Sequence, residues 1–173
     1  ADEVSGLMDL LVLAVAREEA QLQRDGVRIH FVGARAELSE KVRASLHEAE
    51  ARTASNSRIV LNVCFNYGGR WDIVNAVAQL VQSGQALTEA SLAQHLALAH
   101  CADPDLVIRT GGEKRLSNFL LWQVAYSEFH FSDLLWPDFD EAALDEAISE
   151  YAARERRFGK TSDQVAATRG GSA

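Results

Sequence analysis

The sequence predicts an α/β fold with a mainly parallel β-sheet flanked by helices. Two apolar runs, at residues 59–65 (interrupted only by Asn62) and 106–108, and one alternating segment, at residues 27–32, are separated by longer segments with helical spacing. Continuous apolar runs are typical of strands buried on both faces in parallel sheets. Because such strands alternate here with helices, we expect an α/β domain with the order α-β-α-β-α-α-β-β-α.

The length of 173 residues and the net charge of −8 limit the possible classes of protein. One domain is the default at this length, and we predict a single domain over residues 1–160 and a flexible tail over residues 161–173. The acidic balance argues against a protein that binds nucleic acid. Cys64 and Cys101 lack a metal-binding spacing and are expected to be reduced thiols. The N-terminus is acidic, and we recognise no signal peptide in it. Together with the reduced cysteines, this predicts a cytoplasmic protein.

The first predicted helix, Val4–Arg24, has a strongly apolar first half. Ten of the thirteen residues from Val4 to Ala16 are apolar, and they surround the helix on all sides. The run is too short to span a membrane and contains Asp9. Such a helix either belongs to the core or forms the wall of a cavity for a long apolar ligand.

Two strands and the helix between them follow. The strand at residues 27–32 alternates apolar and polar residues, and Ile59–Phe65 predicts a second strand that is buried on both faces. The segment Ala36–Thr53 between them predicts a helix. Its buried side is expected to be formed by Leu38, Val42 and Leu46.

The pentad Asn66-Tyr67-Gly68-Gly69-Arg70 precedes an amphipathic helix, Trp71–Val81. This layout fits a phosphate site at a helix N-terminus and fits an ordinary tight turn equally well. Thr88 is expected to cap a short helix after a polar linker. The spacing of His95, His100 and Cys101 matches no common zinc pattern, so we predict no metal there.

The stretch Asp103–Phe131 carries the strongest indication of function. Leu106–Ile108 predicts a buried strand with Arg109 at its carboxyl end, where ligands bind in open α/β sheets. The glycines of Gly111–Gly112 would let backbone N–H groups approach the oxygens of a small anion. Guanidinium and hydroxyl groups complete such a site. The side chains expected to contribute are those of Arg109, Lys114, Arg115 and Ser117.

A strand and a helix end the predicted fold. Glu128 stands alone between aromatic residues, either as a solvated residue at the strand edge or as a metal ligand or base near the anion site. Asp138 and Glu141 have the spacing of a capping box, with a helix to about Arg157. The basic cluster at its end is either solvated or reaches the anion site. The buried side of this helix is expected to be Leu144, Ile148 and Tyr151.

The sequence resembles the bacterial undecaprenyl diphosphate synthases, a family of cis-prenyltransferases. The resemblance rests on EVSGLMDL (3–10), LNVCFNYGGRWDI (61–73), the block at residues 103–141, and RERRFG (154–159). It covers almost the whole chain, and the long central block is highly specific.

The resemblance implies roles for individual residues. Arg109, Arg115 and Ser117 resemble residues that bind isopentenyl diphosphate, and Glu128 resembles the glutamate associated with Mg²⁺ at that site. A C-terminal Arg-x-Gly element helps to form a site across a homodimer in the family, and its counterparts here are Arg157 and Gly159. The implied walls of the product tunnel are Met8, Leu11, Val27, Ile29 and Ile59, which favours the cavity wall for the first helix.

Two family motifs are not found in the sequence. One is an Asp-Gly-Asn-Gly-Arg-Trp loop with the catalytic aspartate, and the other is a Phe-Ser-x-Glu-Asn-Trp motif. The chain begins almost directly after the place of the second motif. We therefore expect that roughly the first third of a family member, including the first strand, is missing, and that this chain alone is inactive.

The implied reaction condenses isopentenyl diphosphate with an allylic diphosphate, farnesyl diphosphate, to make undecaprenyl diphosphate, the lipid carrier precursor for cell-wall synthesis. The product would be delivered to a membrane, so a location peripheral to the inner membrane is an alternative to a purely cytoplasmic one. A non-catalytic prenyltransferase-like subunit is a second candidate, but such subunits tend to lose the arginines that are present here. A phosphate-sensing module is a third candidate, but a sensor does not need the long apolar helix that the sequence predicts.

Overall fold

The computed structural model describes residues 17–18 and 20–154. The chain divides into two compact units, Ala1–His100 and Cys101–Ala173. The single domain predicted over residues 1–160 stays a prediction, and the predicted tail and most of the predicted helix Val4–Arg24 lie outside the described residues. No described helix is long and apolar enough to cross a membrane.

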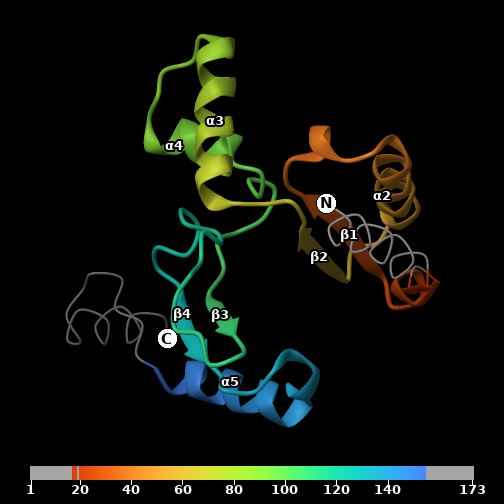
Figure 1. Ribbon diagram of the computed structural model, residues 1–173, viewed down its shortest axis with the longest axis vertical. Coiled ribbons are helices and arrows are strands. Elements are labelled where there is room, and N and C mark those ends of the chain that lie inside the picture. The colour runs from red at the N-terminus through yellow and green to blue at the C-terminus, as the bar shows by residue number, and fades with distance from the viewer. Residues whose placement is uncertain (1–16, 19, 155–173) are drawn as a thin grey trace, which may run out of the picture. The chain divides into compact units, whose positions relative to one another are not determined.

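The first unit begins with helical residues at 17–18 and 20–24. The elements that follow are β1 (Val27–Val32), η1 (Arg35–Glu37), α2 (Glu40–Thr53), β2 (Ile59–Cys64), α3 (Gly69–Ser83) and α4 (Glu89–His95). The second unit contains β3 (Leu106–Arg109), β4 (Glu128–Phe131), η2 (Trp136–Asp138) and α5 (Glu141–Ala153). Both strand pairs are parallel, as the sequence predicted, and Figure 1 shows α2 beside β1 and α5 beside β4.

The core of the first unit lies between α2 and the β1–β2 pair. The predicted buried side of α2 is confirmed, because Leu38, Val42 and Leu46 are at most 6% exposed. They pack with Ile29 and Phe31. These two residues are two positions apart on β1, so their side chains lie on the same face of the strand. Ser39 caps α2 by accepting a hydrogen bond from the Val42 N–H at 3.3 Å.

The helix predicted from Ala36 begins instead at Glu40, after the short 3-10 turn η1. Arg35 in this turn forms an ion pair with Glu50 of α2. The Glu50 carboxylate also accepts a hydrogen bond from the Phe31 N–H at 2.8 Å. Burial raises the pKa of Glu50, but the hydrogen bonds from Arg35 and Phe31 outweigh it and hold the pKa below its ordinary value.

The prediction that Ile59–Phe65 is a buried strand is wrong, because its first three residues are exposed and the others are only half-buried. Ile59, Val60 and Leu61 are 56%, 47% and 41% exposed. The physical reason is that burial requires a covering element, and in the described part of this unit α2 packs on β1. An apolar run predicts a strand, but it does not supply the layer that covers it.

Helix α3 extends two residues beyond each end of the predicted helix Trp71–Val81. Helix α3 ends at Gly84, which has the left-handed φ of 67° that favours glycine at this position. Thr88 caps α4 as predicted, in a reciprocal pair of bonds with Ser91. The carboxylate of Asp72 in α3 is buried, and it accepts hydrogen bonds from the Tyr67 hydroxyl and the Ala97 N–H, each at 2.8 Å.

The predicted cap of the last helix is wrong by two residues. Asp140, rather than Asp138, caps α5 and accepts a hydrogen bond from the Ala143 N–H at 3.0 Å. Asp138 belongs to η2, where Pro137 suits the first turn of a short helix. The helix ends at Ala153 rather than near Arg157.

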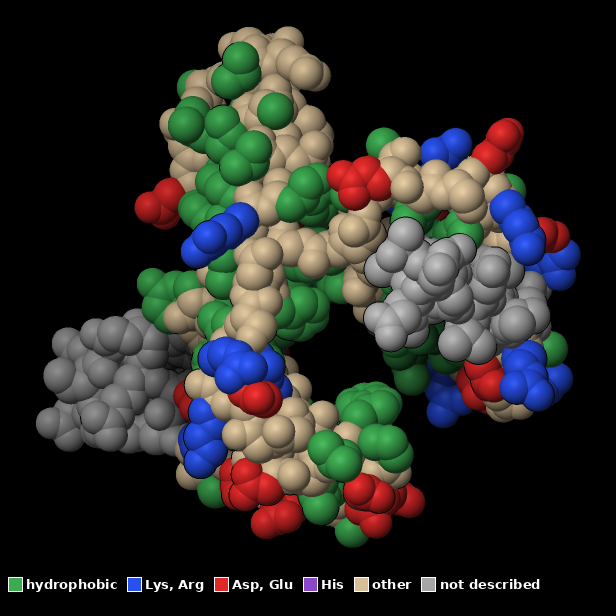
Figure 2. Space-filling view, viewed as in Figure 1, with side chains coloured by type: hydrophobic (Ala, Val, Ile, Leu, Met, Phe, Trp, Pro, Cys, Tyr) green, Lys and Arg blue, Asp and Glu red, His purple; other side chains and the backbone are tan. Residues whose placement is uncertain are grey.

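The predicted buried side of α5 is also wrong. Ala143 and Ala147 are buried, whereas Leu144 and Ile148 are 41% and 47% exposed. Small side chains let the helix backbone approach its neighbour closely, so the alanines rather than the larger residues form the buried side. Acidic side chains gather over α5, with hydrophobic side chains beside them (Figure 2).

Candidate functional site

The candidate site lies in the second unit, where β3 ends. In the parallel register, Arg109 lies opposite Phe131, and Leu106 lies opposite Glu128. Arg109 is therefore at the carboxyl end of the strand pair and Glu128 at the amino end. Three residues along a parallel strand correspond to about 10 Å.

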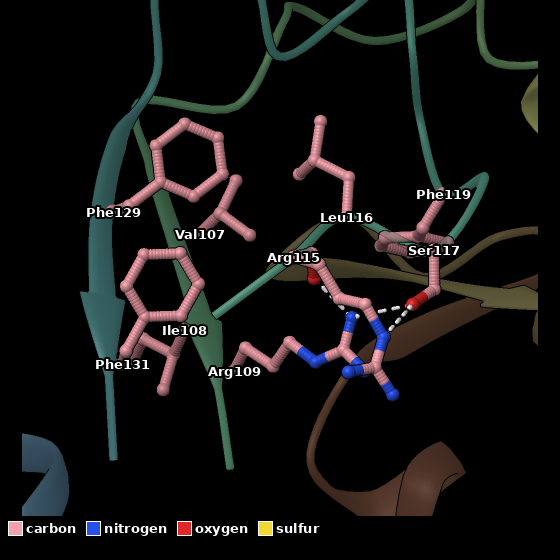
Figure 3. Close-up of a pocket in the computed structure, with 9 residues that line it drawn as sticks. All are labelled: Val107, Ile108, Arg109, Arg115, Leu116, Ser117, Phe119, Phe129 and Phe131. Atoms are coloured by element: carbon pink, nitrogen blue, oxygen red, sulfur yellow. Dashed lines mark hydrogen bonds between the residues drawn. The ribbon is translucent and has the colours of Figure 1, made fainter. Parts of the chain in front are cut away.

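Arg109, Arg115 and Ser117 lie together in the structure (Figure 3). The Ser117 hydroxyl oxygen accepts hydrogen bonds from Arg109 Nη1 at 3.0 Å and from Arg115 Nε at 3.2 Å. Arg109 Nη1 also donates to the Arg115 carbonyl oxygen. Two positive groups that share one hydroxyl would be stabilised by an anion, because the anion offsets their mutual repulsion.

The backbone of this loop has an unusual conformation. Ser117, Asn118 and Leu120 have φ values of 50°, 65° and 45°, in the left-handed region that residues with a side chain rarely adopt. Leu120 is only 9% exposed, so packing holds this strained conformation in place. The buried Leu120 therefore anchors the end of the loop.

The N–H groups of the two glycines themselves already have acceptors within the chain. The Gly111 N–H donates to the Leu134 carbonyl at 2.7 Å, and the Gly112 N–H donates to the Ser132 carbonyl at 2.9 Å. The glycines provide the left-handed turns, with φ values of 83° and 72°, that bring the chain back beside β4. Side chains rather than these N–H groups are left to bind an anion.

A pocket of about 320 Å³ opens beside the arginines. Apolar side chains form most of its lining (Figure 3), and the rings of Phe129 and Phe131 are stacked with centroids 5.8 Å apart. The site therefore combines a cationic mouth with an apolar interior, which suits a short hydrocarbon bearing an anionic group. The lining residues are Val107, Ile108, Arg109, Arg115, Leu116, Ser117, Phe119, Phe129 and Phe131.

Sequence analysis did not identify the aromatic lining or the carboxylate partner of Arg115. Glu113 forms an ion pair with Arg115, two residues away in the same loop. The alternation of Phe129 and Phe131 along β4 was a usable signal, since residues two apart lie on one face of a strand. The ion pair had only the weak signal of opposite charges in one loop.

Glu128 makes a different contact. Its carboxylate accepts a hydrogen bond from Arg154 Nη1 at 2.9 Å, and the same nitrogen donates to the Phe129 carbonyl at 3.0 Å. Arg154 is the C-cap residue of α5, so these contacts connect the end of the helix to β4. In the part of the chain that the structure describes, no group of three His, Cys, Asp or Glu residues could hold a metal ion.

Three of the other predicted site residues lie on the β1–β2 strand pair of the first unit. Val27 and Ile59 lie opposite each other at the start of β1 and β2, and Ile29 is a core residue at 3% exposure. Met8, Leu11, Arg157 and Gly159 lie outside the described residues.

A second pocket, of about 410 Å³, lies where β2 meets α3. Asn66, with a φ of 50°, donates from its side chain to the Ala34 carbonyl at 2.9 Å and to the Glu37 carboxylate at 3.0 Å. The carboxylate of Glu37 also lines this pocket. These contacts favour the tight turn over the phosphate site, because an anion here would face a negative charge.

The histidines show no metal-type arrangement in the described residues. His95 Nδ1 lies 2.8 Å from the Ser91 carbonyl oxygen. His100 Nε2 lies 2.7 Å from Asn62 Oδ1, and its ring centroid is 4.8 Å from that of His30. Burial, followed by the nearby His100, lowers the pKa of His30.

Comparison with known proteins gives a consistent result. A family model whose description names undecaprenyl diphosphate synthase matches residues 1–159. An isoprenyl transferase of Chromobacterium violaceum is 52% identical over 165 residues, covering 95% of this chain and 66% of that protein. A farnesyl-diphosphate-specific ditrans,polycis-undecaprenyl-diphosphate synthase of Pseudomonas aeruginosa is 49% identical over 174 residues, covering 96% of this chain and 69% of that protein. The chain thus spans about two thirds of the length of these curated relatives.

Solved structures agree with the predicted fold. A probable undecaprenyl diphosphate synthase from Campylobacter jejuni has a TM-score of 0.86 at 34% identity, covering 92% of this chain and 76% of that one. Lavandulyl diphosphate synthase from Lavandula x intermedia, in complex with dimethylallyl diphosphate, has a TM-score of 0.85 at 35% identity, covering 92% and 72% respectively. The α/β fold with parallel strands is confirmed by these similarities.

Proposed function

The chain belongs to the undecaprenyl diphosphate synthase family, and from this premise we propose that the protein elongates prenyl chains in the cis configuration. In the proposed reaction, isopentenyl diphosphate condenses with farnesyl diphosphate and its successors to give undecaprenyl diphosphate. The observation that carries the proposal is the pair of arginines with a serine hydroxyl at the mouth of an apolar pocket. The name of the Pseudomonas aeruginosa relative supports farnesyl diphosphate as the allylic substrate and undecaprenyl diphosphate as the product.

In this proposal the second unit binds isopentenyl diphosphate. Arg109 and Arg115 offset the negative charge of the diphosphate. The Ser117 hydroxyl can turn its hydrogen toward the diphosphate, and this hydrogen bond fixes the orientation of the diphosphate. The apolar interior of the pocket takes the five-carbon chain. The allylic diphosphate loses its diphosphate group, the double bond of isopentenyl diphosphate attacks the allylic carbon, and loss of a proton leaves a new cis double bond.

The proposal includes Mg²⁺, which would assist the departure of the diphosphate group. Mg²⁺ is usually held by one or two carboxylates together with phosphate oxygens of the substrate. Glu128 would supply one carboxylate, but that carboxylate is paired with Arg154 at the opposite end of the strand pair from Arg109. The described residues therefore do not by themselves form a magnesium site.

The proposal also covers assembly and location. We expect a homodimer in which Arg157 and Gly159 help to complete the site of a neighbouring copy. We expect a cytoplasmic protein that delivers its product to the membrane, with peripheral contact at the inner membrane. Sedimentation with and without lipid vesicles measures both properties.

Incorporation of labelled isopentenyl diphosphate tests the function directly. The full-length protein, supplied with farnesyl diphosphate and Mg²⁺, is expected to produce a long labelled lipid that can be extracted into an organic solvent. A reaction without farnesyl diphosphate is the control. If a folded full-length protein incorporates no label, the proposal is wrong, and a non-catalytic subunit becomes the better interpretation.

A further inference from the structure

The ion pair between Glu113 and Arg115 places a negative charge beside the proposed diphosphate site. Arg115 is held at two points, because its Nε donates to Ser117 while its Nη1 contacts the Glu113 carboxylate. Both side chains reach solvent, at 42% exposure for Glu113 and 64% for Arg115. The carboxylate therefore occupies a position from which it competes with a ligand for the same guanidinium group.

The Glu113 carboxylate would repel a diphosphate bound at this site. The diphosphate carries about three negative charges, and the Glu113 carboxylate, which contacts the guanidinium group proposed to bind it, adds a further negative charge that repels it even in water and salt. The repulsion opposes the attraction of Arg109 and Arg115, so the site binds its anion less tightly than two arginines alone would allow.

We propose that Glu113 is a counter-ion that limits the affinity of this site for diphosphates, so that the diphosphate end of the elongated product can leave it. The inference rests on the proposed function, in which Arg115 binds isopentenyl diphosphate. In that reaction the growing chain keeps the diphosphate that came from isopentenyl diphosphate. This group must leave the site before the next isopentenyl diphosphate can enter, and a site that holds it too tightly would stop elongation.

Titration calorimetry without metal tests the proposal on the full-length protein, with inorganic diphosphate and inorganic phosphate as probes. Glu113→Gln is expected to bind diphosphate about fivefold more tightly, and phosphate only about twofold more tightly, because the repulsion grows with the charge of the ligand. In turnover, the same variant is expected to lower both KM for isopentenyl diphosphate and kcat. If the substitution acted by changing the packing of the loop, the gain in affinity would not depend on the charge of the probe.

Glu48→Gln is a matched control. Glu48 pairs with Arg52 on α2, and their side chains are 60% and 57% exposed, so this variant removes one charge from a similar surface pair. It is expected to leave both affinities unchanged. An equal gain in the control would assign the effect to net charge and overturn the proposal.

Other outcomes are equally decisive. Unchanged or weaker diphosphate binding by a folded Glu113→Gln protein overturns the counter-ion role while leaving the proposed function intact. If the wild-type protein binds no diphosphate, the assignment of the site fails and this inference fails with it. Circular dichroism checks the fold of the variant, and Glu113→Ala gives an independent second substitution.

Discussion

Replacing Arg109 with alanine is expected to weaken the binding of isopentenyl diphosphate by about 1.5–3 kcal/mol, which corresponds to about 10- to 150-fold in affinity. The lower limit is the loss of one charge-assisted hydrogen bond to the diphosphate. The structure favours the upper part of the range, because Arg109 also donates to Ser117 Oγ and to the Arg115 carbonyl oxygen. Without these bonds, the loop that orients Arg115 loses support.

The fold should tolerate this substitution. The Arg109 carbonyl keeps its main-chain hydrogen bond from the Ser132 N–H at 2.8 Å, and the lost side-chain bonds are exposed. The assay is a titration of isopentenyl diphosphate against the full-length protein, with KM for the same substrate as a second measure. Arg109→Lys should recover part of the affinity, since lysine keeps the charge but not the planar fork. Arg52→Ala removes another surface arginine paired with a carboxylate and is the control. Unchanged affinity in a folded Arg109→Ala protein would refute the role of this residue.

Three further predictions concern stability. Leu46→Ala should lower the free energy of unfolding by about 2–5 kcal/mol in urea titrations, because the side chain is 1% exposed, and a loss below about 1 kcal/mol would contradict the packing. Gly33→Ala should lower the melting temperature strongly, since its Cβ would lie 2.0 Å from the Phe65 carbonyl oxygen at a φ of 146°. Gly84→Ala is the matched control with open space around it, and equal losses in both variants would rule out the clash. Glu50 has a lowered folded pKa, so its contribution is present above its ordinary pKa of 4.5 and is lost as the pH falls through the folded value. Glu50→Gln should therefore be less stable than wild type at pH 7, with a gap that closes below pH 4.5 in urea unfolding, and a gap independent of pH would count against this assignment.

Local sequence signals predicted the elements better than their burial. The pattern of Leu38, Val42 and Leu46 identified the buried side of α2, and Thr88 correctly marked the start of α4. For α5, Asp138 was predicted as the cap, whereas Asp140 is the cap in the structure, because Pro137 and Asp138 fold into a preceding turn. The position of the cap is set by the path of the chain, which spacing alone does not encode.

The site was predictable to the same limited extent. Arg109, Arg115 and Ser117 follow one strand within nine residues, so the short loop keeps them close. The bonds of the two loop glycines were not predictable, because their acceptors, Leu134 and Ser132, lie beyond β4 in the sequence. Contacts between distant segments become visible only once the strands are paired.

The left-handed residues of the anion loop determine how far the site could be moved to another protein. Each such residue costs about 1–3 kcal/mol and keeps its conformation only where the surrounding structure enforces it. A free peptide with the sequence of residues 109–120 would relax to other conformations and separate the two guanidinium groups. The same loop grafted onto a strand of another protein would also relax, because the side chain of Leu120 must be buried among apolar residues to keep its backbone in the left-handed conformation. The binding loop is transferable only together with the part of the hydrophobic interior that anchors it.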